Sequence, residues 1–192
     1  MNIANDCHFL DLSSDNLIVD FNCGDKDLND FFNIDALNYQ NQWLGRTHFF
    51  RDKKTEKIVC AFSLAADSVK TVLLPNSRRK KVKELIPHEK NLQSYPAFLI
   101  GRLGVDKSFE RQGIGSQLIK MIQLYCKNQY PYFGRFIVVD AYNSPEVLNF
   151  YQRNDFTFVF STEQQEKENL KKSVTDTETL RTRQMFFDLM RL

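Results

Sequence analysis

The apolar and polar positions of this chain change their period several times, and each change marks the start or end of an expected element. Alternating or continuously apolar segments predict strands at residues 8–12, 46–51, 57–65, 97–105, 136–141, 157–161 and 183–190. Helical spacing predicts helices over residues 25–44, 82–86, 115–127 and 144–153. The expected fold class is therefore α+β, layered α/β/α, with a mixed and mostly antiparallel sheet of six to seven strands and helices on both faces.

Local signals sharpen several of these elements. Asp25 is expected to cap the helix that follows it, and Pro145 stands near the first turn of the helix at 144–153. The helix at 115–127 has an apolar stripe that we expect to pack on the sheet, made of Ile114, Leu118, Met121, Ile122 and Tyr125. Residues 162–179 are polar and charged, so an exposed helix or a mobile excursion is expected there.

The segment from Ala97 to Ile119 runs from an apolar strand through a charged turn into a glycine-marked helix start. Five amides would be unpaired at the first helical turn, with the positive end of the helix dipole behind them: Gln112, Gly113, Ile114, Gly115 and Ser116. The two glycines remove the Cβ atoms that would hold a pyrophosphate away from the backbone. A P-loop would need a lysine after Gly115, and a dinucleotide fingerprint would need a third glycine. The pattern therefore indicates a different phosphate-binding turn, or else only a tight connection.

Two motifs carry a resemblance to a known family. Arg111–Ser116, which follows a strand ending in Leu103-Gly104-Val105, resembles motif A of the GNAT acetyltransferases, whose amides hold the pyrophosphate of acetyl-coenzyme A. The strand at 136–141 and the segment Asn143–Phe156 resemble motif B, which ends in Phe-Tyr, a short polar turn and usually Gly-Phe. The resemblance implies the GNAT fold in a single domain over residues 1–192. It also implies acetyl-CoA as cofactor, with Arg111 and Asn143 among its ligands.

The chain departs from the family pattern at two positions. Glu110 stands where motif A begins with Gln or Arg, which removes a side-chain donor near the phosphates but leaves the amides and Arg111. Asp155 stands where motif B usually has Gly before the final Phe. Aspartate adopts a left-handed turn conformation more readily than most residues, so the turn is expected to survive. Neither change removes the predicted cofactor site, although both could weaken affinity.

Two further segments narrow the resemblance. Phe21–Phe31 and Ile100–Asp106 are similar to segments of the GNAT toxins of bacterial toxin–antitoxin pairs, which acetylate the α-amine of aminoacyl-tRNA, although Gly104 replaces an alanine. This likeness implies an N-acetyltransferase of a primary amine, with aminoacyl-tRNA as acceptor and an antitoxin as partner; a homodimer is left open. The alternatives are a non-toxic N-acetyltransferase of a small amine or protein N-terminus, and a catalytically silent acyl-CoA-binding module.

The resemblance implies that Tyr151, the Tyr of the Phe-Tyr pair, is the acid that protonates the departing thiolate of coenzyme A. A phenol of pKa ~10 is protonated at neutral pH and can give its proton to a thiolate of pKa ~8.5. For the oxyanion we predict the amides of Leu103, Gly104 and Val105, because glycines at 101 and 104 permit a bulge that frees ladder donors; the pantetheine arm would pair with this edge. The packed-side-chain interpretation of Tyr151 is the alternative.

No residue stands out as the general base. An α-amine of pKa ~8 is roughly a tenth neutral at pH 7, whereas a lysine of pKa ~10.4 is neutral in under one molecule in a thousand, a difference of about 3 kcal/mol. An α-amine acceptor therefore needs less help. Glu, Asp or His48 could still serve through water.

Composition limits the class of protein. A chain of 192 residues can bury a core without disulfides or metal, and the scattered Cys7, Cys23, Cys60 and Cys126 with three histidines predict neither a zinc site nor a disulfide framework. The polar N-terminus and the lack of an apolar run of ~18 residues predict no signal peptide and no membrane span, so the protein is expected in the cytoplasm.

The net charge of +2 is too small to indicate nucleic-acid binding by itself. A local cluster of Arg78, Arg79, Lys80 and Lys81, with Lys83, is expected inside a loop from Pro75 to Pro96. Such a cluster is either a solvated face or a surface for tRNA phosphates. The second interpretation makes these four residues the candidate substrate contacts.

Overall fold

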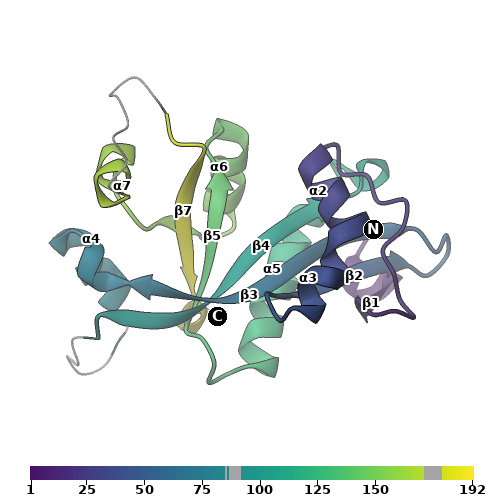
Figure 1. Ribbon diagram of the computed structural model, residues 1–192, viewed down its shortest axis with the longest axis horizontal. Helices are drawn as coiled ribbons and strands as arrows, with labels where there is room; N and C mark the ends of the chain where they lie inside the picture. Colours follow the sequence, from purple (N-terminus) through teal and green to yellow (C-terminus); the bar gives the residue numbers. More distant parts are fainter. Residues whose placement is uncertain (85, 87–91, 171–178) are drawn as a thin grey trace. The chain divides into compact units, whose positions relative to one another are not determined.

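The computed structural model describes residues 1–84, 86, 92–170 and 179–192. Its strands form one mixed seven-stranded sheet in the order β1-β2-β3-β4-β5-β7-β6 (Figure 1). The strands are β1 (Cys7–Asp11), β2 (Arg46–Asp52), β3 (Ile58–Lys70), β4 (Ser94–Val105), β5 (Phe136–Tyr142), β6 (Thr157–Phe158) and β7 (Thr182–Asp188). Antiparallel pairs join β1 to β2, β2 to β3, β5 to β7 and β6 to β7, while β4 and β5 are parallel. The predicted fold class is confirmed.

The helical elements fall close to their predicted positions. The α-helices are α1 (Ile3–Asp6), α2 (Lys26–Asp30), α3 (Ala36–Asn41), α4 (Asn76–Lys83), α5 (Ile114–Gln129), α6 (Pro145–Arg153) and α7 (Glu163–Asn169). A π-helical turn, η1 (Phe31–Asp35), joins α2 to α3, and short 3₁₀ turns are η2 (Thr71–Leu73), η3 (Lys107–Phe109) and η4 (Leu189–Arg191). Asp25 caps α2 through a hydrogen bond from the Leu28 amide, as predicted.

Two expectations about helices were wrong. The basic cluster is not in a loop, because residues 76–83 form α4. The helix expected at 82–86 is this same helix, which begins and ends closer to the N-terminus than expected. In the rest of the expected loop, residues 85 and 87–91 lie outside the described residues. The charged segment expected to be exposed contains α7, in which Glu166 is buried. Residues 171–178 of that segment also lie outside the described residues.

The chain divides into two compact units, each made of two stretches of sequence. Residues 1–66 and 100–125 form the first unit, and residues 67–99 and 126–192 form the second. Both β3 and β4 pass from one unit into the other. The single domain expected over residues 1–192 stays a prediction.

In the first unit, α5 and the α2–η1 segment cover opposite faces of β2. On one face His48 and Phe50 meet aromatic rings, His48 lying 4.9 Å from Tyr125 of α5 between ring centroids. On the other face Phe49 packs in a cluster with Phe31 and Phe32 of η1. The alternation of side chains along the strand separates the two faces.

The second unit buries an aromatic core between its strands and α4. Phe136 of β5 contacts Tyr95 and Phe186, with ring centroids 6.1 and 5.8 Å apart. Val82 of α4 packs into the same cluster. Figure 1 shows β5 and β7 side by side, in agreement with their register from Phe136–Asp188 to Tyr142–Thr182. All four cysteines are free, and only Cys23 among them is not buried.

Candidate functional site

The turn before α5 leaves its backbone open, in a conformation that includes two left-handed residues. Arg111 and Gly113 both adopt left-handed conformations, with φ of 58° and 72°. A Cβ built on Gly113 would meet no atom within 4 Å, so the backbone there is open to an approaching group. The amide of Gln117 donates to the carbonyl of Gly113, and the amides of residues 114–116 precede this first bond of the helix. The turn therefore presents donors and the positive end of α5 together.

Asp106 fixes the start of this turn. Its buried carboxylate accepts hydrogen bonds from the Ser108 amide at 2.9 Å, from the Ser108 hydroxyl, and from the Asn22 amide at 2.9 Å. Its own amide donates to the carbonyl of Val59 at 2.9 Å. The last residue of the Gly-Arg-Leu-Gly-Val-Asp segment thus holds the end of β4 to two other segments, a role that the sequence analysis did not give it.

The glycines of β4 have a packing reason. A Cβ on Gly104 would lie 3.1 Å from the Phe21 ring and 3.3 Å from Cys23 Cβ, and one on Gly101 would lie 3.2 Å from the Ser63 hydroxyl. The pairing of β4 with β5 covers Ala97–Leu99, whereas β4 itself continues to Val105. The use of the amides of Leu103, Gly104 and Val105 as oxyanion donors stays a prediction.

Tyr151 lies on α6 in the second unit and is buried, with 6% of its surface exposed. Pro145 is at the first turn of α6, as the sequence predicted, and Ser144 caps the helix. The Tyr151 ring contacts Phe150 and Phe156 edge-on, with centroids 5.1 and 5.3 Å away. Burial raises the pKa of the phenol well above its usual value. No described residue hydrogen-bonds its hydroxyl, so the proton is not committed to a partner within the described chain.

The turn after α6 forms despite the missing glycine. Asp155 takes the left-handed conformation with φ of 66°, as predicted. The amides of Asn154 and Phe156 both donate to the carbonyl of Tyr151, at 3.1 and 3.0 Å. The end of motif B is therefore closed around the backbone of the candidate catalytic residue.

Asn143 has protein partners that the sequence did not reveal. Its side-chain amide donates to Glu163 Oε2 at 3.2 Å and to the Leu180 carbonyl at 2.9 Å, which uses both hydrogens. Its backbone amide donates to the carbonyl of Arg181 at 3.0 Å. Asn143 thus ties β5 to α7 and to the start of β7, and its side-chain donors are occupied.

The basic cluster divides into two pairs. Arg79 donates to the carbonyls of Thr71 at 3.0 Å, Leu74 at 3.2 Å and Val72 at 3.4 Å. Arg78 Nε donates to the Val159 carbonyl at 3.1 Å, and partial burial lowers the pKa of its guanidinium. Lys80 and Lys81 are exposed. The two arginines hold α4 to its own unit, although the buried Nη2 of Arg78 has no partner among the described residues, and Lys80 and Lys81 face solvent.

Arg102 is a candidate that sequence reasoning left without a role. Its guanidinium lies over the Phe31 ring, 5.1 Å from the centroid, and donates to the Gly101 carbonyl at 2.8 Å. The side chain is exposed beside the segment predicted to supply the oxyanion donors. The alternation along β4 alone could not identify this stacking, because Phe31 is 71 residues away in the sequence.

Comparison with known proteins matches part of the chain to a family. Residues 75–158, which contain the turn before α5 and the helix of Tyr151, match the family model of the acetyltransferase (GNAT) domain. Among solved structures, this chain is similar to AtaT complexed with acetyl-methionyl-tRNAfMet, with a TM-score of 0.70 and 18% identity over 97% of this chain and 96% of that one.

Two other solved structures share the GNAT fold of this chain. One is a tyrosine-to-phenylalanine mutant of KacT, with a TM-score of 0.65 and 18% identity over 97% of both chains. The other is an AtaT mutant toxin bound to the C-terminus of the antitoxin AtaR and acetyl-CoA, with a TM-score of 0.62 and 16% identity over 97% of this chain and 96% of that one. The predicted fold is confirmed, and residues 75–158 match an acetyltransferase (GNAT) domain.

The described residues contain no group of three or more His, Cys, Asp or Glu side chains that could hold a metal ion. None of the helices that they form is both long and apolar enough to cross a membrane.

Proposed function

We propose that this protein transfers the acetyl group of acetyl-CoA to the α-amine of aminoacyl-tRNA. The observation that carries the proposal is the turn at residues 111–116, where two left-handed residues and an open Gly113 lead into a GNAT helix start. The similarity to AtaT complexed with acetyl-methionyl-tRNAfMet supports the acceptor class.

The cofactor is proposed to lie on the backbone donors of the first unit. The amides of Gln112, Gly113, Ile114, Gly115 and Ser116 would hold the pyrophosphate, with Arg111 adding charge beside it. The amides of Leu103 to Val105 would orient the pantetheine arm and stabilise the negative charge on the carbonyl oxygen. Bound acetyl-CoA supplies an acyl group that is activated as a thioester.

Tyr151 is proposed to protonate the departing thiolate. Its raised pKa keeps the phenol neutral across the physiological range, so the proton is present whenever the reaction needs it. The same burial makes the phenol a weaker acid, and the transfer is favourable only because a desolvated thiolate also holds a proton more strongly. The acceptor nitrogen would form the new C–N bond and lose a proton to solvent, the C–S bond would break, and the departing thiolate would take the Tyr151 proton. The Tyr151 phenolate would then regain a proton from solvent, which restores the acid for the next turnover.

The proposed acceptor needs little help from a general base, and no residue of the sequence stands out as one. An α-amine of pKa ~8 is partly neutral at pH 7 and needs less deprotonation than a lysine. Lys80 and Lys81 are the residues of the cluster proposed to contact tRNA phosphates, because both are exposed. Arg78 Nε, Arg79 and the side chain of Asn143 already donate to carbonyl or carboxylate groups of the protein.

An antitoxin is proposed as the protein partner. The support is the similarity to an AtaT mutant toxin bound to the C-terminus of AtaR. A co-purification from the native host, followed by acetylation with and without the co-purifying protein, tests this part. An inhibitor of acetyl transfer is expected among the bound proteins.

The reaction is tested with labelled acetyl-CoA and charged total tRNA. We expect label on the aminoacyl group, released from the tRNA by mild base as an N-acetyl amino acid. The control is the same assay with deacylated tRNA, which has no α-amine. Efficient labelling of small amines or peptide N-termini, without labelling of charged tRNA, would favour the non-toxic acetyltransferase instead.

A further inference from the structure

The first unit contains a charged cavity that the proposed reaction has not used. Its volume is about 640 Å³, and it lies among the end of β2, the turn before β3, the segment at residues 19–22 and η3. Three basic residues line it, Arg51, Lys57 and Lys107. They come from three separate segments, so only the tertiary structure brings them together.

None of the three cations forms an ion pair with a described residue, although the carboxylates of Asp20, Glu56 and Asp106 line the same cavity. The Asp106 carboxylate is occupied by Ser108 and Asn22. Arg51 lies over the Phe49 ring at 5.4 Å, which orients its guanidinium without neutralising it. Positive charge is therefore available to a ligand.

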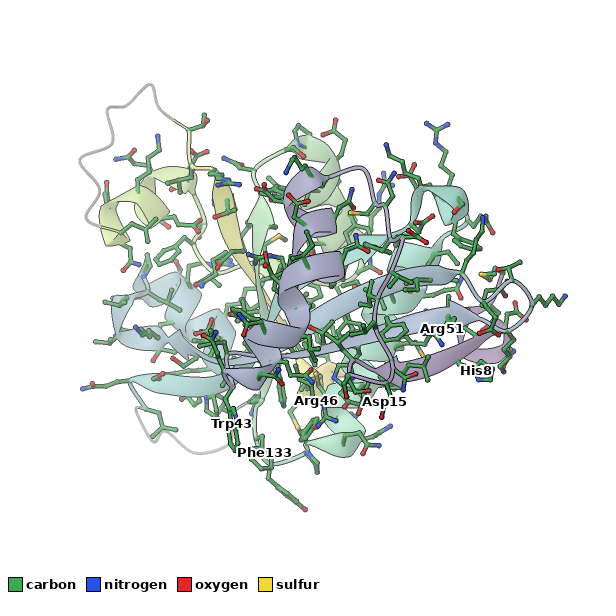
Figure 2. All side chains as sticks on the ribbon, turned by 45° about the vertical axis from the view of Figure 1, so that its right-hand side comes forward. His8, Asp15, Trp43, Arg46, Arg51 and Phe133 are labelled. Atoms are coloured by element: carbon green, nitrogen blue, oxygen red, sulfur yellow. The ribbon has the colours of Figure 1, made fainter. Side chains whose placement is uncertain are left out.

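Arg51 reaches the cavity from the face of β2 opposite α5. It comes from the C-terminal part of β2 (Figure 2) and shares its face with Phe49, which packs against the η1 segment. His48 and Phe50 point to the other face, where His48 meets Tyr125 of α5. Lys107 and Ser108 reach the cavity from η3, which precedes the phosphate turn in the chain. Coenzyme A is therefore present in the binding test below, so that its own site is filled.

The remaining lining distinguishes RNA from other polyanions. Asp20 and Glu56 are exposed carboxylates at the cavity, and carboxylates accept hydrogen bonds from hydroxyl groups. A ribose-phosphate chain offers phosphate oxygens to the cations and 2′-hydroxyls to the carboxylates. An acidic peptide has no such regular hydroxyl donors for Asp20 and Glu56.

We propose that this cavity binds the ribose-phosphate backbone of the acceptor RNA, with Arg51, Lys57 and Lys107 on phosphates and Asp20 and Glu56 on 2′-hydroxyls. The inference rests on the proposed aminoacyl-tRNA acceptor. It places a substrate contact in the first unit, in addition to Lys80 and Lys81 in the second.

The test compares two variants that lose the same charge. The cavity variant is Arg51→Gln, Lys57→Gln and Lys107→Gln, and the control variant is Lys70→Gln, Lys120→Gln and Lys127→Gln. Binding of deacylated tRNA to the protein with coenzyme A present is measured at salt concentrations from about 50 to about 300 mM, where lost phosphate contacts change the affinity measurably. We expect the magnitude of the slope of log affinity against log salt to decrease by about 2 to 3 in the cavity variant. The control slope should change by less than about 0.5, because no phosphate contact is lost.

Two further measurements keep the result interpretable. The single variant Lys57→Gln, at an exposed position before β3, should lower the slope by about 0.7 to 0.9 even if the triple variant folds poorly. The double variant Asp20→Asn, Glu56→Gln should reduce the ratio of the affinity for an RNA hairpin to the affinity for a DNA hairpin of the same sequence. Acetylation of a free amino-acid amide should be unchanged in every variant.

The outcomes separate this inference from the proposed function. Equal slopes in cavity and control variants would overturn it, as would loss of antitoxin binding in the cavity variant with an unchanged tRNA slope. A wild-type protein that binds tRNA with a cavity-dependent slope, but does not acetylate charged tRNA, would support the cavity and reject the acceptor.

Discussion

Tyr151 is a single residue that must both pack against its neighbours and supply a proton. Its ring packs between Phe150 and Phe156, and its hydroxyl is the only proposed proton donor of the reaction. Burial raises the pKa of the phenol, so the two demands have the same origin: the apolar contacts that hold the ring also keep the proton in place.

Replacing Tyr151 by Phe is expected to lower kcat by about 10²-fold or more, within the range of general acid catalysis, with little change in KM for acetyl-CoA. The ring contacts remain, so the free energy of unfolding should change by less than about 1 kcal/mol. In the wild type, kcat should show no loss from phenol deprotonation up to at least pH ~10, because the raised pKa lies above the ordinary value. Full thiol release by the variant in steady state would place the acid elsewhere.

His48 is a buried residue whose ionisation belongs to stability. It is 1% exposed, its Nδ1 lies 2.7 Å from Asp11 Oδ1, and burial lowers its pKa in spite of this carboxylate. The unfolded chain therefore binds a proton at His48 before the folded chain does. The stability contribution is fully present above the unfolded pKa of 6.5 and is lost as the pH falls below it.

We expect the free energy of unfolding of the wild type to fall by up to about 1 kcal/mol more than that of His48→Gln between pH 7.5 and 5.5. Urea unfolding at both pH values measures this difference, and Gln keeps a donor for Asp11. The explanation fails if the two proteins lose the same stability on acidification.

At the scale of elements, the strand-to-helix turn and α4 illustrate opposite uses of charge. The turn before α5 leaves backbone donors open next to Gly113. The two arginines in the N-terminal half of α4 donate to carbonyls of η2 and of the residue after β6, and the second half of α4 exposes lysines. Both elements place positive charge at a helix. The open backbone donors of the turn and the exposed lysines of α4 are the groups that a ligand can reach.

Gly113 is the sharpest test of the turn. Gly113→Asp is expected to weaken acetyl-CoA binding by at least about tenfold, because its carboxylate would face the pyrophosphate, whereas the neutral Gly113→Asn tolerates the left-handed conformation and should lose less. Gly115→Asp is expected to weaken binding in the same direction. Calorimetry on the folded variants measures the effect, and equal affinities for the Asp and Asn variants would remove the pyrophosphate from this position.

Arg79 should behave as a structural residue. Arg79→Ala removes the donor from three carbonyls, and we expect the free energy of unfolding to fall by about 1 to 3 kcal/mol. The neighbouring Lys80→Ala should stay within about 0.5 kcal/mol of wild type. Urea unfolding of both variants tests the division of the cluster, and a destabilised Lys80→Ala beside an unaffected Arg79→Ala would reverse it.

For the whole molecule, the distribution of charge matters more than its sum. The net charge of +2 gives a weak overall field. Available cations are nevertheless grouped on each compact unit, around the cavity in the first and at Lys80 and Lys81 of α4 in the second. Each group is proposed to contact the same RNA.

If both groups contact the RNA, their losses should add. The cavity variant combined with Lys80→Gln and Lys81→Gln is expected to lower the salt slope by about 4 to 5, the sum of about 2 to 3 and about 2. The same tRNA titrations measure all three proteins. A combined variant no weaker than the cavity variant alone would exclude the α4 lysines from the interface.

Much of this protein could be predicted from residues that are close together in the sequence. The strands and α5 follow from hydrophobic period, the cap of α2 from Asp25, the start of α6 from Pro145, and the phosphate turn from glycines at a helix start. The left-handed Asp155 was also predicted, because its conformational preference is a property of the residue. These features need only a few neighbouring residues, and the sequence alone therefore determines them.

Only the tertiary structure decided which polar groups are free. Arg79, Asn143 and the buried pair of Glu166 with Arg183, 2.6 Å apart, all find partners through segments that meet after folding. The cavity cations come together for the same reason, from three separate segments, and form no ion pair with a described residue. A charge in a sequence has no fixed role, because its role depends on whether folding places an acceptor against it or leaves it facing solvent.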